Sequence, residues 1–349
     1  MYDALLQVPI IGMEVEAFVL LLITALAGGA FGAAIGALPA FIFTGFLVFL
    51  GEGLLIAGDP AVSVTGVIGF GAITGPHIAF AGGVAASAYA GKKYPEMNPA
   101  DGGYHFGKDI TYAFGTKPDI LAVGAVFGVV GVLINQLSGS LLVVSGTGLT
   151  DSIALTVVLS ALIARVAFGY PIIGKPAGDG LLDMSPFERG EDHPKADSGA
   201  EEHAGRPATE PWLPHQYKWS GVTAIGLVGG ILGGYIWLQT GSIFLGYAIS
   251  AISLLFLQLG VEKIPVTHHI TLIGAVGAVV VDPIAGSVVA LLAAGVFGAI
   301  SGLFGEVTQR IFYAHGGTHV DPPAMAIALA MVIIAILHIA GVIPNAGYV

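Results

Sequence analysis

The stretch Tyr112-Ala-Phe-Gly-Thr-Lys-Pro-Asp119 returns about 200 residues later as Tyr313-Ala-His-Gly-Gly-Thr-His-Val-Asp321. Both copies carry Tyr-Ala, a glycine, a threonine and an aspartate in the same order, and a long apolar run follows each aspartate. A motif that recurs together with its surroundings indicates an internal repeat. The chain is therefore predicted to consist of two related halves.

The similarity extends well beyond this motif. Residues 26–45 and 227–246 are identical at eight of 20 positions, all at a constant separation of 201. Thr65 matches Thr267 at a separation of 202, the same separation as Asp119 and Asp321. Biased composition alone would scatter such matches over many separations, so the steady spacing indicates a duplication.

The composition predicts a membrane protein. Of the 349 residues, 55% are hydrophobic, only 10% are charged, and 53 are glycine, which leaves too little polar surface to cover a soluble protein. Several apolar runs approach the roughly 20 residues that a helix needs to cross the hydrocarbon core, and backbone in lipid must satisfy its own hydrogen bonds. We therefore expect an all-α polytopic integral membrane protein with about nine transmembrane spans.

The expected spans can be placed along the chain from the apolar runs and the prolines between them. They are Val15 to Ile35, Phe41 to Ile56, Val62 to Ala90, Asp119 to Leu137, Ser152 to Tyr170, Val222 to Leu238, Ile243 to Leu259, Ile270 to Phe304 and Pro322 to Ile343. Residues 14–139 form the first predicted repeat and residues 217–343 the second. Residues 140–216 form a connector of one transmembrane helix and an acidic loop, in which nine carboxylates and three basic residues between Asp179 and Glu210 favour a solvated, mobile segment.

Two of the spans are predicted to be interrupted near the membrane midplane. Thr74-Gly-Pro-His77 divides the third span and Asp282-Pro283 divides the eighth. Proline removes an amide donor and clashes with the preceding turn, so each segment is expected to form two half-helices. The separation between Pro76 and Pro283 is 207, so the two interruptions are similar in kind but do not align with the rest of the repeat.

Lysine and arginine residues set the expected orientation. With the N-terminus outside the cell membrane, ten of the twelve fall in cytoplasmic loops, which is the usual bias. Arg165 lies near a cytoplasmic helix end, where its side chain is expected to reach the interface, and Arg310 is expected outside. This topology places the acidic linker, residues 171–217, in the cytoplasm and the repeats in inverted orientation. Re-entrant hairpins at residues 62–90 and 267–304 would instead make the repeats parallel.

The ends of the half-helices are the candidate binding site. A helix that ends inside the membrane exposes amide donors or carbonyl acceptors there, and broken helices of this kind bind solutes and ions in secondary transporters. A carboxylate such as Asp282 is expensive in lipid unless it is paired, hydrated or protonated, and a histidine such as His77 changes charge near neutral pH. The competing interpretations are that Asp282 caps a helix and that the prolines only kink their helices. The candidate substrate or ion-binding residues are Thr65, Thr74, Gly75, His77, Thr267 and Asp282.

Several classes of function lack support in the sequence. The chain has no cysteine, which excludes disulfides and thiolate metal ligands, and it has no basic stripe that would bind nucleic acid. His315, His319 and Asp321 are metal-ligand types, but intervening glycines spoil their spacing, and Asp119 and Asp321 are expected to cap helices. The sequence contains no hydrolase or transferase motif. We therefore expect no enzyme activity, no cofactor and no metal site.

The function that these features favour is secondary transport of a small ion or polar solute, coupled to protons or another ion. The alternatives are a channel of the same architecture and a noncatalytic subunit or scaffold of a larger membrane complex. The lipid bilayer is the expected partner, and the pair Gly124-x-x-x-Gly128 allows either a homo-oligomer or packing within one chain. The sequence does not name the substrate, the coupling ion or the direction.

Overall fold

The computed structural model describes residues 7–58, 63–99, 103–193 and 205–349, and this part of the chain is almost entirely helical. The helices are α1 (Val15–Ile35), α2 (Ala37–Ile56), the π-helical turns η2 (Thr65–Gly69) and η3 (Pro76–Phe80), α3 (Ala81–Lys93), the 3-10 turns η4 (Pro95–Met97) and η5 (Phe106–Lys108), α4 (Pro118–Leu141), α5 (Ser152–Ala167), α6 (Ser185–Glu188), α7 (Trp219–Thr240), α8 (Phe244–Gln258), α9 (His268–Ala285), α10 (Ser287–Thr308), η7 (Gln309–Tyr313) and α11 (Pro322–Ile339). Strands β1 (Val143–Val144) and β2 (Thr147–Gly148) form a short antiparallel hairpin.

The surface of the bundle is that of a membrane protein. Within the described residues, seven helices are long and apolar enough to span a bilayer. Their outward faces carry large apolar side chains, such as Leu20 on α1, Leu232 on α7 and Leu292 on α10, each more than half exposed. Side chains of this kind are stable at a protein surface in such density only against lipid. The predicted polytopic, all-helical membrane protein is confirmed.

Glycine faces bring helices into backbone contact in both halves of the chain. A Cβ on Gly29 of α1 would lie 2.2 Å from the carbonyl oxygen of Gly124 in α4, and a Cβ on Gly230 of α7 would lie 2.2 Å from that of Ala294 in α10. No side chain fits at such separations, so glycine is required there. Gly128 also packs on α1, so the Gly124-x-x-x-Gly128 face is used within the chain and does not indicate a second copy.

The interruption predicted in the third span is confirmed. The helical path stops after η2 and resumes at η3, which continues directly into α3. Between them, Thr74 donates its hydroxyl to Ile68 O (2.9 Å), and Thr44 of α2 donates to Thr74 O (2.6 Å). Carbonyl groups that the break removes from the helix are thus satisfied by threonine hydroxyls, as non-helical backbone inside a membrane protein requires.

The interruption predicted at Asp282-Pro283 is wrong. Residues 268–308 form two separate helices, α9 and α10, which pack against each other and join at Gly286. Gly286 has φ of 79°, a conformation that glycine adopts without strain. Asp282 therefore lies in the last turn of α9 at an end of the bundle, where it accepts a hydrogen bond from Ser287 Oγ (2.8 Å). The predicted midplane half-helix end does not exist there, because the chain reverses instead of continuing.

The helix assigned to the connector is central. α5 packs against α3, α4 and α11, and Asp151 caps it by accepting from Ala154 N (2.8 Å). Asp321 caps α11 in the same way through Ala324 N (2.8 Å), as predicted. Asp119, in contrast, lies inside the first turn of α4 and accepts from Tyr94 OH (2.6 Å). The predicted cap at Asp119 is therefore wrong, whereas Asp151 caps α5 in the way that Asp321 caps α11.

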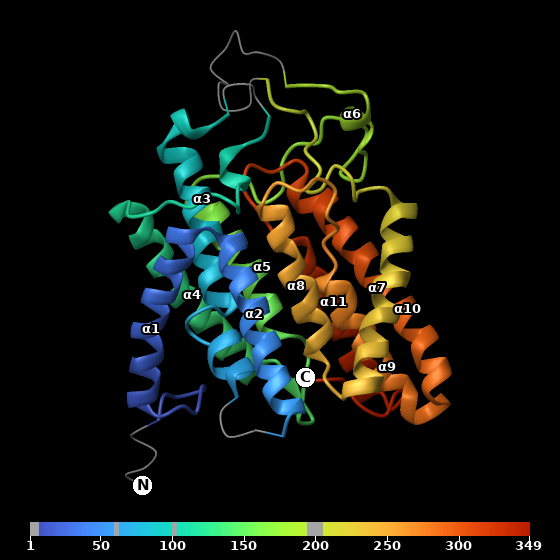
Figure 1. Ribbon diagram of the computed structural model, residues 1–349. Coiled ribbons are helices and arrows are strands. Elements are labelled where there is room, and N and C mark those ends of the chain that lie inside the picture. The colour runs from blue at the N-terminus through green and yellow to red at the C-terminus, as the bar shows by residue number, and fades with distance from the viewer. Residues whose placement is uncertain (1–6, 59–62, 100–102, 194–204) are drawn as a thin grey trace.

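The acidic linker forms an ordered layer over one end of the bundle (Figure 1), apart from residues 194–204, which lie outside the described residues. Arg310 at the end of the α10 span donates to the carbonyl oxygens of Leu182 (2.6 Å) and Tyr217 (2.9 Å) in this linker. The expectation that Arg310 lies on the side opposite the linker is therefore wrong. The predicted mobility is also wrong for the described part, because it is tied to the bundle by such contacts.

We predict that Gly131→Ala destabilises the protein, because the added Cβ would lie 1.6 Å from the carbonyl oxygen of His77. Backbone cannot move away as a flexible side chain can, so the loss should be at least about 1–3 kcal/mol in unfolding free energy. Gly139→Ala in the same helix meets nothing within 4 Å and should be neutral or stabilising. Thermal unfolding of the two variants in detergent checks this, and equal midpoints would contradict the close approach of α4 to η3.

Candidate functional site

A cavity of about 1190 Å3 lies inside the bundle and is the candidate site. Its walls come from both halves of the chain: α2 and the break before α3 on one side, α8, α9 and α11 on the other, with the start of α5 and the C-terminal residues completing it. Linker residues, including Pro207 and Trp212, line its end at the surface layer. A mostly apolar cavity with few polar groups between two halves is the usual form of a small-molecule site.

The predicted site residues lie near this cavity but do not form it: within the described chain, the lining includes none of the six. Pro76 lines the cavity, whereas the neighbouring His77 is buried against α4 through its backbone. Gly75 is also buried, at the N-terminal end of η3. Thr267 precedes α9 without capping it by its side chain, and Asp282 is at the far end of that helix. The six predicted residues are therefore not part of the cavity lining.

Thr65 leads to a polar cluster that sequence reasoning missed. Its hydroxyl donates to Glu52 Oε1 (2.8 Å), and Ser242, just before α8, donates to Glu52 Oε2 (2.6 Å). Glu52 is only 6% exposed. Its carboxylate therefore joins the two halves through two hydroxyl groups. A single acid near the end of an apolar span was the available signal, since such residues are rare in transmembrane helices.

A non-helical stretch before α9 carries His268 into the cavity. The side-chain amide of Gln216 accepts from Val266 N (2.9 Å) and donates to Val266 O (3.0 Å), so the linker satisfies this backbone as a neighbouring strand would. His268 follows and lies between Phe41 and Tyr247, with ring centroids 4.7 Å and 5.7 Å away. His268 therefore lies inside the bundle, because the stretch before α9 descends into it.

Two helices begin at the cavity with an aspartate at each start. Thr150 donates its hydroxyl to Ala328 O (2.9 Å), so the start of α5 lies beside the middle of α11, about 10 Å along the axis from Asp321. Tyr247 lies near enough to Asp151 and Asp321 to interact electrostatically with both. The positive ends of two antiparallel helices, each with its carboxylate, thus face the same cavity.

A buried ion cluster joins the linker to the cavity wall. Lys108 Nζ lies 2.7 Å from Glu210 Oε2, and Arg206 also pairs with Glu210. Burial lowers the pKa of Lys108 to about 8 although Glu210 opposes this shift. Burial raises the pKa of Glu210, but Lys108 and Arg206 together outweigh it, and the net pKa lies below the ordinary value. The same ammonium group lies over the ring of Tyr313 at 4.6 Å.

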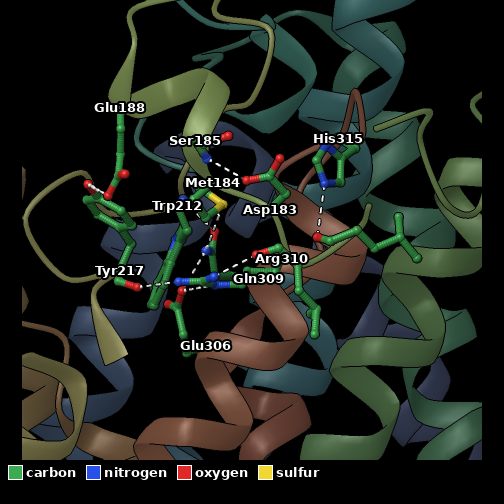
Figure 2. Close-up of polar contacts among 12 residues, drawn as sticks. Asp183, Met184, Ser185, Glu188, Trp212, Tyr217, Glu306, Gln309, Arg310 and His315 are labelled. Atoms are coloured by element: carbon green, nitrogen blue, oxygen red, sulfur yellow. Dashed lines mark hydrogen bonds and ion pairs between the residues drawn. The ribbon is translucent and has the colours of Figure 1, made fainter. Parts of the chain in front are cut away.

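Arginines of the bundle hold the rest of the linker. Figure 2 shows Arg310 and Gln309 surrounded by the linker residues Met184, Trp212 and Tyr217. Arg310 pairs with Glu306 (2.6 Å) and also lies over the ring of Trp219. Because both partners of this ion pair are buried and further hydrogen-bonded, the contact fixes the position of the linker.

Arg165 holds another non-helical segment in place, this one inside the bundle. It is completely buried and donates to both the hydroxyl (2.7 Å) and the carbonyl oxygen (2.7 Å) of Thr318, as well as to Ile172 O. It does not extend to the interface as expected. Instead it satisfies the non-helical backbone that precedes α11, so the position of Asp321 depends on it.

A protein-family model described as a family of unknown function (DUF7973) matches residues 10–349. The chain belongs to this family. Neither a curated protein nor a solved structure matches it. The match covers both halves and the linker.

The cavity residues that sequence reasoning missed have little in the sequence that marks them as functional. Asp151 stands alone before an apolar run, and Tyr247, Phe244 and Tyr348 resemble ordinary apolar residues of a span or a terminus. The signal for Asp151 was the capping pattern before an apolar run, which it shares with Asp321. Nothing in the sequence indicates that these residues meet, because the contact depends on how α5 and α11 cross.

We predict that Glu210→Gln detaches the linker from the bundle, because it leaves the buried Lys108 without its carboxylate. Breaking one side of a buried pair typically removes about 3–5 kcal/mol of unfolding free energy. Glu191→Gln is the matched control: it removes an ion pair to Arg189 whose partners are 56% and 43% exposed and should change little. Limited proteolysis within residues 205–217 reports the detachment, and equal cleavage of both variants would contradict it.

The same variant gives a pH dependence. The folded pKa of Glu210 lies below its ordinary value, so its stabilisation is complete above that value and is lost as pH falls through the folded pKa. The wild-type linker should therefore become protease-sensitive on acidification. Glu210→Gln lacks this group, so its cleavage rate should show a smaller acid-dependent increase in a comparison at matched pH values.

Proposed function

We propose that the protein is a secondary transporter for a small ion or polar solute, which binds in the central cavity and is exposed to each side of the membrane in turn. The observation that carries this proposal is a cavity of about 1190 Å3 between two sets of helices that repeat the same contacts. Transporters of this kind place their site at the interface of inverted repeats.

The repeated contacts support a unit of five helices. Gly128 of α4 packs on the carbonyl oxygen of Ala25 in α1, and Gly298 of α10 packs on that of Gly226 in α7. Ala25 and Gly226 are 201 residues apart, and Gly128 and Gly298 are 170 residues apart. In this correspondence α1 matches α7, and α4 matches α10. The first half in this proposal is α1 to α5, the second is α7 to α11, and the linker joins them.

The break and the caps follow the same correspondence. Gly131 lies against the carbonyl oxygen of His77, and Ser301 donates to that of His269 (3.0 Å). Gly131 and Ser301 are 170 residues apart, as are the two capping aspartates Asp151 and Asp321. An odd number of crossings in the first half brings the second half into the membrane from the opposite side, which supports inverted topology.

Proton coupling is assigned to His319 and Asp321 in this proposal. His319 Nε2 lies 3.1 Å from Asp321 Oδ1, and both side chains are buried beside the cavity. Histidine paired with a carboxylate is a common proton donor and acceptor in proteins. This pair replaces His77 and Asp282 as the coupling group, since Asp321 lines the cavity and neither His77 nor Asp282 does.

We also propose that the linker end of the bundle faces the cytoplasm of a cell membrane. The lysine and arginine residues that the structure describes lie at this end, in the linker, in the adjacent loops or in the last turns of helices. Loops rich in these residues stay on the cytoplasmic side. The start of α1 and the C-terminal residues then face the outside.

We predict that a cysteine replacing Ile327, which lines the cavity on α11, reacts with a membrane-impermeant methanethiosulfonate reagent applied to either side. The natural chain has no cysteine, so no background reaction occurs. Ala290→Cys on α10, equally apolar, completely buried and outside the cavity lining, should stay unreactive. Reconstituted protein should also pass no steady current under an applied voltage.

The outcomes separate the functional classes. Reaction of the Ile327 variant from both sides without current supports a carrier. Reaction from both sides together with currents that scale with voltage contradicts it in favour of a channel. A variant that reacts from neither side, in protein that copurifies with stoichiometric partners, contradicts it in favour of a scaffold.

A further inference from the structure

Asp151 is a carboxylate at the cavity without a basic partner. One oxygen accepts from Ala154 N (2.8 Å) and the other from Tyr348 OH (2.8 Å). Among the described residues, no lysine, arginine or histidine forms an ion pair with Asp151. Asp151 is half-buried, and its charge is compensated by the positive end of α5 and these two hydrogen bonds but by no cation, the partner that buried acids usually have.

Helix capping does not explain the charge. Serine, threonine or asparagine would cap α5 as well as aspartate does, without placing a charge beside an apolar cavity. Asp321, which caps α11 in the corresponding way, has His319 at 3.1 Å, a group that can carry positive charge. Asp151 has the hydroxyl of Tyr348 in that place, so of the two capping carboxylates only Asp321 has a partner able to become cationic.

A row of aromatic rings leads to Asp151. Tyr348, whose hydroxyl holds the carboxylate, contacts Phe244 with ring centroids 5.2 Å apart. Phe244 contacts Phe70 at 5.3 Å, and Phe70 contacts Tyr247 at 5.8 Å. All four side chains line the cavity. Aromatic faces attract cations through their quadrupole, and an arrangement of several rings with a nearby carboxylate recognises alkylated ammonium groups.

We propose that this part of the cavity, formed by Asp151, Phe70, Phe244, Tyr247 and Tyr348, binds an organic cation of the alkylammonium class. This inference rests on the proposed function, because it takes the bound cation to be the solute that is transported. Asp151 compensates its charge, the aromatic row contacts its alkyl groups, and the cavity volume of about 1190 Å3 accommodates a molecule considerably larger than an inorganic ion.

The first experiment compares choline with 3,3-dimethylbutan-1-ol, which has the same shape without the charge. Binding to the full-length protein in lipid nanodiscs is measured by isothermal titration calorimetry. Choline should bind at least tenfold more tightly than the neutral alcohol. Equal affinities would overturn the proposal, because shape alone would then account for binding.

The variants separate charge from fold. Asp151→Asn keeps the cap and the side-chain volume and should weaken choline at least tenfold while leaving the alcohol unchanged. Asp282→Asn, a carboxylate outside the cavity lining, should bind both ligands as the wild type does. Phe244→Leu removes a ring face and keeps an apolar side chain, and should weaken choline several-fold. Choline affinity that is unchanged in Asp151→Asn would overturn the proposal, and equal unfolding midpoints show that the variants are folded.

Uptake into proteoliposomes distinguishes the two levels of the argument. Choline that binds through Asp151 but is not accumulated or exchanged leaves the cation site standing and contradicts transport. Uptake of acetate by protein that fails to bind choline leaves transport standing and contradicts the cation site. Saturable choline counterflow that is lost in Asp151→Asn supports both.

Discussion

Non-helical backbone inside an apolar bundle must find its hydrogen-bond partners within the protein, because lipid offers none. Three stretches of the chain are under this constraint, and each is held by a side chain from a distant part of the sequence. Thr44 holds the break at Thr74, Gln216 holds the stretch at Val266, and Arg165 holds the stretch at Thr318. Each stretch leads directly into a helix whose first residues line the cavity. The cavity therefore lies where the helices are interrupted, and each interruption is possible because a distant side chain satisfies its backbone.

The features that could be predicted from the sequence are those that depend on local spacing. Glycines at a four-residue interval mark a close helix contact at Gly124 and Gly128, and proline after glycine at residues 75–76 marks a true break. The turn at Gly286 was not predicted, because proline at residue 283 is the stronger sequence signal for a helix break. A helix nevertheless accommodates proline in its last turn, and the chain reverses at the glycine. The count of spans and the alignment of the second half both depended on this turn, which explains why Asp321 was matched to Asp119 and not to Asp151.

Pairings between distant residues could not be predicted, because composition records how many charges a segment has and not where they point. The linker contains many more acids than bases, which is typical of a solvated segment. Its behaviour is decided instead by Glu210, which lies against Lys108, and by the carbonyl oxygens that Arg310 reaches. These two bundle cations determine the structure of the linker more than its overall acidic composition does. Breaking a buried ion pair costs several kcal/mol, whereas exposed charges contribute little to stability.

Contacts with distant residues also make the two ends of the cavity different. In the proposed repeat, Asp151 and Asp321 occupy one ancestral position, and their difference lies in what the rest of the chain brings to each. Asp321 receives His319 from the stretch that Arg165 holds, whereas Asp151 receives Tyr348 from the C-terminal residues. One carboxylate therefore has a basic neighbour within the protein, and the other has only hydrogen-bond donors and faces the cavity. Duplication by itself would produce two equal sites. The residues outside the repeat supply that inequality.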